Sequence, residues 1–472
     1  MKLPKESIVH TFEFNNYYYA IDTNSGSLHE LNGTAFDVIN KINKYKELNL
    51  HNIDKNNITN ELDKKWPGNT INKVLEEVET LIQKEQLFSD IIIETDKIKK
   101  NNDQLKALCL NISHTCNMKC KYCFAGGGTF GQDTKKKDLM DFDTAKKAVD
   151  FLLENSNERK NCEIDFFGGE PLLNWEVVKK TVHYAREKAS KNNKNIKFTL
   201  TTNGLSLDNE VMRFLNEHDF AVVLSLDGRK EINDTNRKSL YDDKSTYDSI
   251  VGLYQEFVES RDHKEYFVRG TFSADNLDFT RDVEHIYDLG FKDISLEPVV
   301  CSKEKNYSLE NVDLDLIKKE YERLTLFYEE KADKGEGFSF YHFEINLDGG
   351  PCVKKRFSGC GAGSEYLAIT PSGEIYPCHQ FVGNDEFVMG DLKKSFLVDQ
   401  SVKNKFNEHN FLSKKKCKEC WAKFHCGGGC HANAYLFNGN MEEPHKTGCE
   451  LLKKRIECAL YLASKGLLQR YR

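Results

Sequence analysis

The sequence of 472 residues has no long hydrophobic run, because no apolar stretch approaches the roughly 20 residues that span a bilayer. Its first residues, MKLPKESIVH, lack the apolar core of a signal peptide. It also has no excess of basic residues, since 67 Lys and Arg stand against 74 Asp and Glu, a net charge of −7. These absences argue against a membrane protein, a secreted protein and a broad nucleic-acid-binding face. We therefore expect a cytoplasmic protein.

Cysteine, in contrast, is plentiful, with 15 residues in the chain. Thiols stay reduced in the cytoplasm, so this number favours metal or cluster ligation over disulfides. The hydrophobic content of 39% is that of an ordinary globular protein. A chain of this length exceeds what one compact core can organise, so we expect two to four domains.

The pattern of residues divides the chain into three parts. Residues 1–93 contain strand-like stretches followed by apolar residues at helical spacing, which predicts a small winged-helix-like module. The polar run at 94–104 is the expected linker. Residues 105–345 alternate six short apolar strands with helical segments, which is typical of an α/β fold with a parallel sheet or partial barrel. Residues 346–472 hold nine of the cysteines.

Three polar motifs follow predicted strands of the middle part. They are FFGGEP (166–171), TTNG (201–204) and SLDG (225–228). Active sites of parallel α/β folds lie at the carboxyl ends of the strands, so we expect these motifs to meet at one site.

A loop with three cysteines, CNMKCKYCF, follows the first strand of the middle part. A structural zinc ion takes four tetrahedral ligands, whereas Cys116, Cys120 and Cys123 are three. His114 is the candidate for a fourth zinc ligand. A [4Fe–4S] cluster held by three thiolates would instead leave one iron open to a cofactor or substrate. An open metal position indicates a catalytic site.

The spacing C-x-x-x-C-x-x-C, with an aromatic residue before the last cysteine, resembles the motif of radical S-adenosylmethionine (radical SAM) enzymes. The resemblance implies that S-adenosylmethionine chelates the open iron and is cleaved, after one-electron reduction, to a 5′-deoxyadenosyl radical. It implies a partial (β/α)6 TIM-type barrel. It also implies a set of cofactor-binding residues. Those residues are Tyr122, Gly168, Gly169, Glu170, Thr202, Asn203, Ser225, Asp227 and Arg269.

Within this set, the family assigns different contacts to different residues. The carboxylate and backbone at Glu170 are expected to meet the methionine amino group of the cofactor. Asn203 and Ser225 are expected at its ribose and carboxylate. Tyr122 is expected to border the adenine, and Arg269 to serve as a charge partner.

The stretch CKECWAKFHCGGGC (417–430) resembles the SPASM extension of radical SAM enzymes, although C-x-x-C pairs also bind zinc. The resemblance implies two auxiliary [4Fe–4S] clusters, and so three clusters in all. The distal one would be held by Cys417, Cys420, Cys426 and Cys449. The inner one would be held by Cys360, Cys378 and Cys430, with Cys352 as a possible fourth ligand.

Nearly the whole chain resembles the maturases of SCIFF peptides, through stretches such as EIDFFGGEPLLN and VVLSLDGRKE. That family joins a cysteine sulfur to a carbon of an acceptor residue, often threonine, in a cysteine-rich precursor peptide. The N-terminal module resembles the RiPP recognition element, which binds leader peptides along a strand edge. The candidate edge is Phe12–Ile21, beside the helix Thr70–Leu87. A low-potential electron donor of the flavodoxin or ferredoxin type is the expected second partner.

Two other functions compete with this interpretation. An anaerobic sulfatase maturase would oxidise a cysteine or serine to formylglycine and would need no leader-binding module. A non-catalytic iron–sulfur or zinc protein that binds peptides would have no use for the Gly-Gly-Glu motif. The N-terminal module could also merely cap the barrel.

Overall fold

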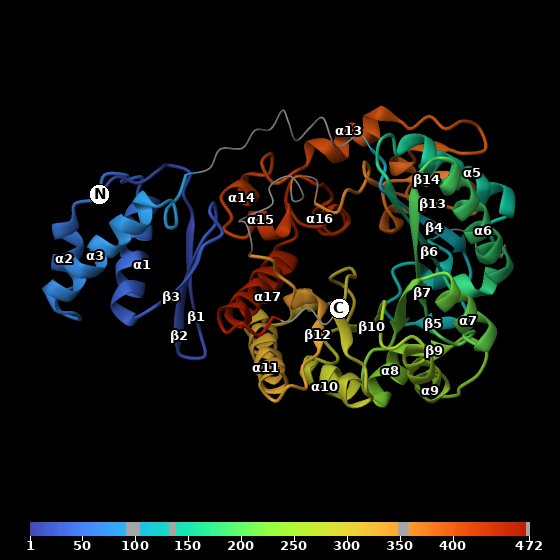
Figure 1. Ribbon diagram of the computed structural model, residues 1–472, viewed down its shortest axis with the longest axis horizontal. Coiled ribbons are helices and arrows are strands. Elements are labelled where there is room, and N and C mark those ends of the chain that lie inside the picture. Colours follow the sequence, from blue (N-terminus) through green and yellow to red (C-terminus); the bar gives the residue numbers. More distant parts are fainter. Residues whose placement is uncertain (91–103, 132–137, 348–356, 358, 469–472) are drawn as a thin grey trace.

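The structure is a computed structural model, and it describes residues 1–90, 104–131, 138–347, 357 and 359–468. The expected linker 94–104 lies outside the described residues, apart from Gln104. Within the described ranges, no helix is both long and apolar enough to cross a membrane. Figure 1 shows a small N-terminal module beside a larger body.

The N-terminal module is a three-stranded antiparallel sheet with three helices. Its elements are β1 (Val9–Phe14), β2 (Tyr17–Asp22), β3 (Leu28–Leu31), α1 (Gly33–Glu47), α2 (Lys55–Leu62) and α3 (Gly68–Gln83). The side chain of Asn32 starts α1 by accepting the N–H of Ala35. In α3, Ile71, Val74 and Val78 recur at helical spacing and are buried against the other helices.

The order β1-β2-β3 leaves β1 and β3 as the two edges of this sheet. The expected peptide-binding segment Phe12–Ile21 contains the end of β1, which is an edge strand, and most of β2, which pairs with both neighbours. A strand with two partners cannot accept a third. The carbonyl of Val9, on β1, accepts the side chain of Asn43 from α1. The other edge of the sheet is β3.

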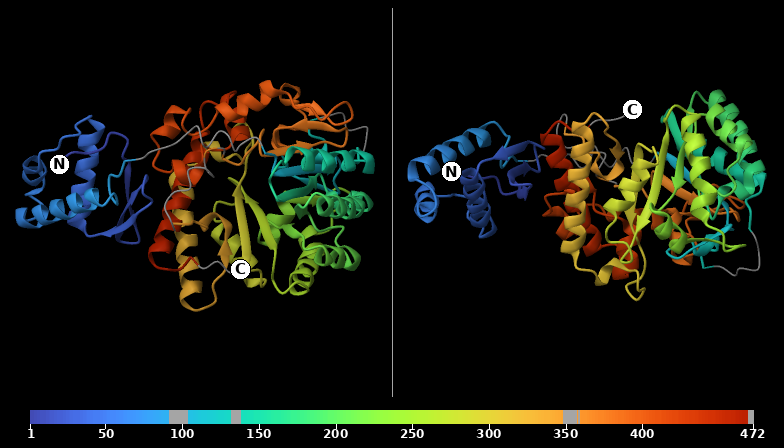
Figure 2. Two further views of the ribbon diagram at one scale, coloured as in Figure 1. Left: turned by 45° about the horizontal axis from the view of Figure 1, so that its top comes forward. Right: turned by 90° about the horizontal axis from the view of Figure 1, so that it is seen from below.

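The module is packed firmly on the last helix of the chain, α17 (Lys446–Ser464). Phe12, Phe14 and Tyr19 belong to the same hydrophobic core as the larger body. The ring of Phe14 stacks on Tyr461 of α17 with centroids 4.3 Å apart. Figure 2 shows the module against this helix from two further sides. The position of β3 relative to the larger body is therefore set by a shared core.

Substituting Phe14→Ala is expected to loosen this packing. The change removes a buried ring and leaves a cavity, so the free energy of unfolding should fall by roughly 3–5 kcal/mol. In differential scanning calorimetry, the module should then unfold in a separate, earlier transition. Leu48→Ala, in the same module but 69% exposed, is the matched control and should change little. A single unshifted transition for Phe14→Ala would contradict the shared core.

The larger body is built on one sheet with the order β12-β11-β10-β8-β7-β6-β4-β13-β14-β15. Its first seven strands in chain order are β4 (Ala107–Ser113), β6 (Asn161–Gly168), β7 (Asn195–Thr202), β8 (Ala221–Ser225), β10 (Tyr266–Phe272), β11 (Asp293–Pro298) and β12 (Ser339–Phe340). Neighbours among them run parallel. The six predicted strands are confirmed, and the open curved sheet is the expected partial barrel.

Helices cover the outer face of this sheet (Figure 1). They are α5 (Phe142–Asn155), α6 (Trp175–Lys191), α7 (Asn209–Glu217), α8 (Lys230–Asn236), α9 (Thr246–Glu259), α10 (Thr280–Asp288) and α11 (Leu314–Asp333). Along β6, buried residues such as Ile164 and Phe166 alternate with half-buried ones such as Asp165 and Phe167. The buried set faces the helices, so the concave inner face is the accessible one.

The C-terminal part extends the same sheet. β13 (Tyr366–Ile369) runs parallel to β4, and β14 (Glu374–Tyr376) returns antiparallel as the predicted hairpin, followed by β15 (Gly390–Asp391). The remaining helices are α13 (Gln400–Glu408), α14 (Lys415–Lys418), α15 (Lys423–Cys426), α16 (His431–Asn438) and α17. These elements bring the cysteine-rich segments to the open side of the barrel near Cys116.

Candidate functional site: three sets of cysteines

The three-cysteine loop leaves the carboxyl end of β4 at the mouth of the barrel. Its middle forms β5 (Met118–Cys120), which pairs antiparallel with β9 (Arg237–Ser239), so that Cys120 lies opposite Arg237. Backbone N–H groups point at two of the thiols. Met118 N–H donates to Cys116 Sγ at 3.4 Å, and Gly127 N–H donates to Cys123 Sγ at 3.3 Å.

These donors fit thiolates that hold an iron–sulfur cluster. Hydrogen bonds to sulfur stabilise thiolate charge and tune a cluster. Burial raises the pKa of Cys116 to about 12 and that of Cys120 to about 11. At neutral pH such thiols become thiolates only when a cationic centre binds them. The loop is therefore suited to a cluster rather than to free reactive thiols.

The zinc alternative finds no fourth ligand at this loop. The ring of His114 packs on Phe130 with centroids 4.9 Å apart, and burial lowers its pKa to about 4. Across the described ranges, no three or more His, Cys, Asp or Glu residues are placed to hold a metal ion. A single zinc ion draws its ligands tightly together, whereas the ligands of a cluster bind different iron atoms and lie farther apart.

The Gly-Gly-Glu carboxylate braces the strand ends. Glu170 is 1% exposed, and its oxygens accept the Thr202 hydroxyl at 2.8 Å, the Asn203 N–H at 2.8 Å and the Leu172 N–H at 3.1 Å. These bonds fix the positions of the Glu170 and Thr202 side chains at the strand ends, and their contacts with S-adenosylmethionine stay predictions.

Asn203 lies beside the cysteine loop. Its side-chain amide donates to Asn117 Oδ1 at 2.7 Å and lies 3.5 Å from Cys116 Sγ. Its own Oδ1 accepts the N–H of Leu205. The TTNG motif therefore supports the cysteine loop, and the contact of Asn203 with the cofactor stays a prediction.

Asp227, which is buried, and Tyr122, which is half-buried, form a pair that sequence reasoning did not identify. The Tyr122 hydroxyl donates to both Asp227 oxygens, at 2.6 and 2.7 Å, and Asp227 also accepts the Thr271 N–H. Asp227 is fully buried and orients Tyr122, and its own contact with the cofactor stays a prediction. Burial raises the pKa of Asp227, and the guanidinium of Arg237 opposes that rise.

Arg237 is the functional residue that the motifs missed. It is buried, and its guanidinium donates to the Tyr122 hydroxyl at 3.2 Å. Its Nε has no partner among the described residues. Arg237 lies at the site because β9 pairs with β5. No motif or spacing in the sequence predicts that pairing. The fold thus places a buried cation beside Cys120 and Asp227.

Four of the expected cofactor contacts remain accessible in the barrel mouth. Tyr122, Gly169 and Ser225 are half-buried, and the Arg269 side chain is 49% exposed in the middle of β10. Arg269 lies beside Ser225 in the sheet register. Its nearest carboxylate is Glu297, at 3.8 Å. These residues remain the predicted contacts to S-adenosylmethionine.

Gly168 lets two strands approach more closely than a side chain would allow. It has φ +126°, and a Cβ there would lie 2.3 Å from the carbonyl oxygen of Ser113. We expect Gly168→Ala to lower the free energy of unfolding by roughly 2–5 kcal/mol, because both strain and overlap are added. Gly290→Ala is the control, since Gly290 also has positive φ (+97°) but no neighbour within 4 Å. Equal shifts of the denaturation midpoints would contradict the close approach.

The structure gathers the C-terminal cysteines into two sets. Cys417, Cys420 and Cys426 all raise the pKa of Cys449, after burial, which is the largest cause. Cys449 lies in the first turn of α17, where the helix dipole favours a thiolate. These four cysteines lie near one another, and their role as ligands of a distal cluster stays a prediction.

The second set joins Cys360, Cys378 and Cys430. Burial is the largest cause of the raised pKa of Cys378, and the thiols of Cys360 and Cys430 add to it. The thiols of Cys360 and Cys430 therefore lie near that of Cys378, and the crossing of the chain from a distal to an inner ligand set stays a prediction. Cys352, the possible fourth inner ligand, lies outside the described residues.

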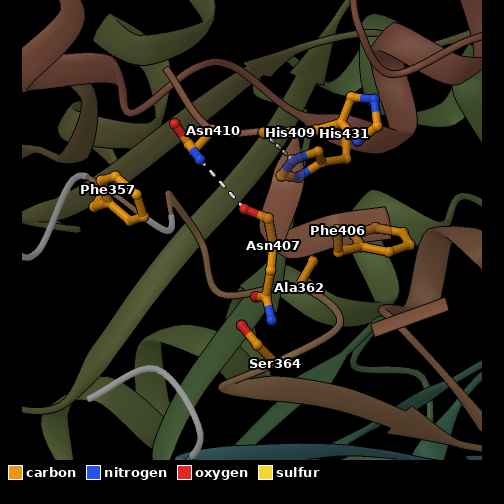
Figure 3. Close-up of a pocket in the computed structure, with 8 residues that line it drawn as sticks. All are labelled: Phe357, Ala362, Ser364, Phe406, Asn407, His409, Asn410 and His431. Carbon is orange, nitrogen blue, oxygen red and sulfur yellow. Dashed lines mark hydrogen bonds between the residues drawn. The ribbon is translucent and has the colours of Figure 1, made fainter. Parts of the chain in front are cut away.

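Figure 3 shows a small pocket whose wall includes residues that neighbour two of these cysteines in sequence. Ala362 is two residues from Cys360, and His431 follows Cys430. His431 Nε2 is hydrogen-bonded to the carbonyl of His409 at 2.8 Å. The full lining is Phe357, Ala362, Ser364, Phe406, Asn407, His409, Asn410 and His431. Aromatic and amide groups therefore dominate this pocket.

Four cysteines lie outside these sets. Cys109, Cys162 and Cys458 are buried. Cys301, after β11, is half-buried and packs against the main core.

Comparison with known proteins decides the family. Residues 110–260 match the Radical SAM superfamily, and residues 360–421 match the SPASM iron–sulfur cluster-binding domain. An uncharacterized protein of Methanocaldococcus jannaschii is 32% identical over 68% of this chain and 96% of its own length. The chain belongs to the radical SAM superfamily. It carries a SPASM domain, and it is a radical SAM/SPASM enzyme of the peptide-maturase group.

Two further relatives are informative. The radical SAM cyclopropyl synthase TigE of Paramaledivibacter caminithermalis is 25% identical over 91% of this chain and 89% of its own length. The cysteine-type anaerobic sulfatase-maturating enzyme of Clostridium perfringens is 28% identical over 69% of this chain and 88% of its own length. The cyclopropyl synthase thus aligns with more of this chain than the sulfatase-maturating enzyme does.

Solved structures share the fold. The structure of native anSMEcpe with bound AdoMet and Cp18Cys peptide superposes with a TM-score of 0.62 and 23% identity. The match covers 77% of this chain and 99% of the anSMEcpe chain. Streptococcus suis SuiB bound to precursor peptide SuiA covers 95% of this chain and is covered to 99%, with a TM-score of 0.53 and 17% identity. At these identities the likeness shows the fold alone.

The cofactors of this enzyme are S-adenosylmethionine and [4Fe–4S] clusters. When bound, they supply a carbon-centred radical that removes a hydrogen atom from an unactivated carbon. The described residues fit this role, because the Cys116 loop has three thiols, donors to sulfur and an accessible glycine-rich strand end beside it.

Proposed function

We propose that this enzyme installs an intramolecular thioether in a ribosomally made, cysteine-rich precursor peptide of the SCIFF type. The bond joins a cysteine sulfur to a carbon of an acceptor residue, for which threonine is one candidate. Three [4Fe–4S] clusters serve the reaction, one at Cys116, Cys120 and Cys123 and one at each C-terminal set. The proposal divides the chain into a recognition module (1–93), a linker (94–104), a radical SAM barrel (105–345) and a SPASM domain (346–472).

The observation that carries the proposal is the N-terminal module with its open strand edge. An extended leader peptide can add to β3, where backbone hydrogen bonds give affinity and side-chain pockets give specificity. The imidazole of His29, on β3, is hydrogen-bonded to the carbonyl of Gln86 after α3, which ties this edge to the helix beside it. A sulfatase maturase has no need of such a module, and the sulfatase-maturating relative aligns with only 69% of this chain.

The module also contacts the SPASM domain directly. The imidazole of His10 stacks on Trp421 with centroids 3.9 Å apart and is hydrogen-bonded to Glu457 of α17 at 2.9 Å. Thr23 donates to the carbonyl of Trp421, the residue after Cys420. A peptide bound at β3 would thus be held at a constant distance from the clusters. This supports a peptide substrate that is anchored at one end and modified at the other.

The reaction balances as the loss of two hydrogens from the peptide. One hydrogen atom leaves the acceptor carbon and is taken up as 5′-deoxyadenosine. The cysteine sulfur bonds to that carbon, its proton passes to a base, and one electron leaves toward an auxiliary cluster. The electron that starts each turnover comes from a low-potential donor of the flavodoxin or ferredoxin type, which we propose as the second partner.

Anaerobic reconstitution followed by mass spectrometry tests the reaction. The iron-loaded enzyme is incubated with dithionite, S-adenosylmethionine and a cysteine-rich SCIFF-type peptide, and the product is then alkylated. We expect a peptide lighter by two hydrogens with one cysteine that resists alkylation. Loss of two hydrogens with every thiol still alkylated would indicate carbon–carbon ring closure and overturn the thioether. An aldehyde at a former cysteine would favour formylglycine formation.

Leader dependence tests the module separately. The same peptide without its leader should bind at least about tenfold more weakly, which corresponds to about 1.4 kcal/mol. Fluorescence anisotropy of labelled peptides measures the difference. A scrambled leader of equal composition is the control. Equal affinities for all three peptides would show that the module does not bind the leader and only caps the barrel.

A further inference from the structure

A buried lysine lies between the two auxiliary sets of cysteines. Lys414 precedes α14 in the run Lys414–Lys416, and it is only 2% exposed, whereas Lys415 and Lys416 are exposed. Its Nζ donates to the carbonyl of Gly428 at 3.0 Å. Gly428 belongs to the short loop between Cys426 of the distal set and Cys430 of the inner set. The ammonium group therefore rests on the segment that links the two sets.

The backbone of Lys414 holds this side chain in place. Its carbonyl accepts the N–H of Cys417 and that of Lys418, both at 2.9 Å, and its own N–H donates to Asn410. Lys414 is thus fixed at the start of the turn that presents Cys417. Because both ends of the residue are anchored, the ammonium position cannot relax far toward solvent.

The charged neighbours of Lys414 are thiols from both sets. Burial lowers its pKa, and Cys417, Cys426, Cys430 and Cys449 each raise it. Three of these thiols belong to the distal set, and Cys430 belongs to the inner set. No carboxylate pairs with Lys414 in the part of the chain that the structure describes. A buried ammonium without a carboxylate partner is costly unless other negative charge surrounds it.

We propose that Lys414 is a shared counter-cation of the two auxiliary clusters, which stabilises both and raises the reduction potential of both. Thiolate-ligated clusters are negatively charged, and each becomes more negative on reduction. A fixed cation in a poorly solvated site therefore favours the reduced state. One cation near both sets raises the reduction potentials of both auxiliary clusters. Both clusters then accept an electron from the substrate more readily. The inference rests on the clusters and not on the thioether chemistry.

The test is a redox titration followed by electron paramagnetic resonance on full-length, iron-loaded protein. Lys414→Gln removes the charge and keeps a hydrogen-bond donor, whereas Lys414→Arg keeps the charge. Lys415→Gln is the matched control, because it makes the same change one residue away on an exposed, solvent-screened side chain. The signal of the Cys116 cluster is the internal reference. We expect both auxiliary midpoints to fall in Lys414→Gln only.

Every other outcome either supports or overturns the proposed role of Lys414. Loss of iron from Lys414→Gln but not from Lys414→Arg would support it, because the clusters then depend on the charge. Unchanged midpoints in fully loaded Lys414→Gln would overturn it. A shift of the distal midpoint alone would overturn the shared role. Iron loss in both variants would show that the lysine is only a structural prop. None of these measurements requires peptide modification. Failure of the proposed thioether chemistry can therefore be distinguished from failure of the proposed role of Lys414.

Discussion

Replacing Cys116, Cys120 and Cys123 together by alanine is expected to reduce 5′-deoxyadenosine formation to the background of the reductant alone. Without the three thiolates no iron is held at the barrel mouth, so the cofactor loses both its anchoring iron and the adjacent source of the electron that cleaves it. Chromatography of the anaerobic reaction measures the product. The iron content should fall by that of one cluster and no more, because the two C-terminal sets are separate.

Cys458→Ala provides the matched control for this loss. Cys458 is fully buried, and its Sγ lies 3.7 Å from the carbonyl of Tyr321 in the main core. Its removal should cost roughly 1 kcal/mol of stability and leave cofactor cleavage intact. If the triple variant still cleaved S-adenosylmethionine, or if Cys458→Ala abolished cleavage equally, the role of the loop would be wrong.

Substituting Arg237→Leu is expected to have the second largest effect. The change leaves Asp227 as a buried carboxylate without its nearby cation, and loss of a buried compensating charge costs roughly 3–5 kcal/mol. It also releases Tyr122, whose hydroxyl is held between Asp227 and Arg237. We therefore expect a lower denaturation midpoint together with a large fall in 5′-deoxyadenosine formation, measured on the same preparation.

This variant should also acquire a characteristic pH dependence. Burial already raises the pKa of Asp227, and loss of Arg237 raises it further. A carboxyl whose pKa is higher in the folded than in the unfolded state stabilises the fold when it is protonated. That stability is lost as the pH rises through the folded pKa. The Arg237→Leu variant should therefore be more destabilised relative to the parent at pH 8 than at pH 6.

The double variant Arg237→Leu, Asp227→Asn separates charge from shape. Removing both charges leaves no uncompensated ion, so part of the lost stability should return and the pH dependence should vanish. A double variant that is as unstable and as pH-dependent as Arg237→Leu would show that packing, and not the ion pair, governs this site.

The architecture of the barrel could be predicted because its signals are local. Alternation of apolar strands with helical segments leaves few topologies, and parallel strands bring their carboxyl ends to one edge. For this reason FFGGEP, TTNG and SLDG meet near Cys116, as expected. The division of the C-terminal cysteines into a distal and an inner set, in contrast, came from the resemblance to the SPASM extension and not from their spacing.

The roles of the side chains within those motifs could not be predicted in the same way. Glu170, Thr202 and Asp227 stand in motifs that a family associates with the cofactor, yet they are buried and brace other groups. Whether a strand-end side chain faces a ligand or a neighbouring strand depends on burial. Burial is a property of the packed structure, so a motif alone does not decide it.

The sequence by itself determined the fold class, the order of the elements and the residues that meet at the barrel mouth, because periodicity and spacing are local properties of the chain. Only the tertiary structure decided that β3 and not β2 is an edge of its sheet, that Arg237 is buried beside Cys120, and that Lys414 lies between two sets of thiols. These three facts depend on contacts between segments far apart along the chain. Such contacts are selected by the packing of the whole molecule, and no local pattern encodes them.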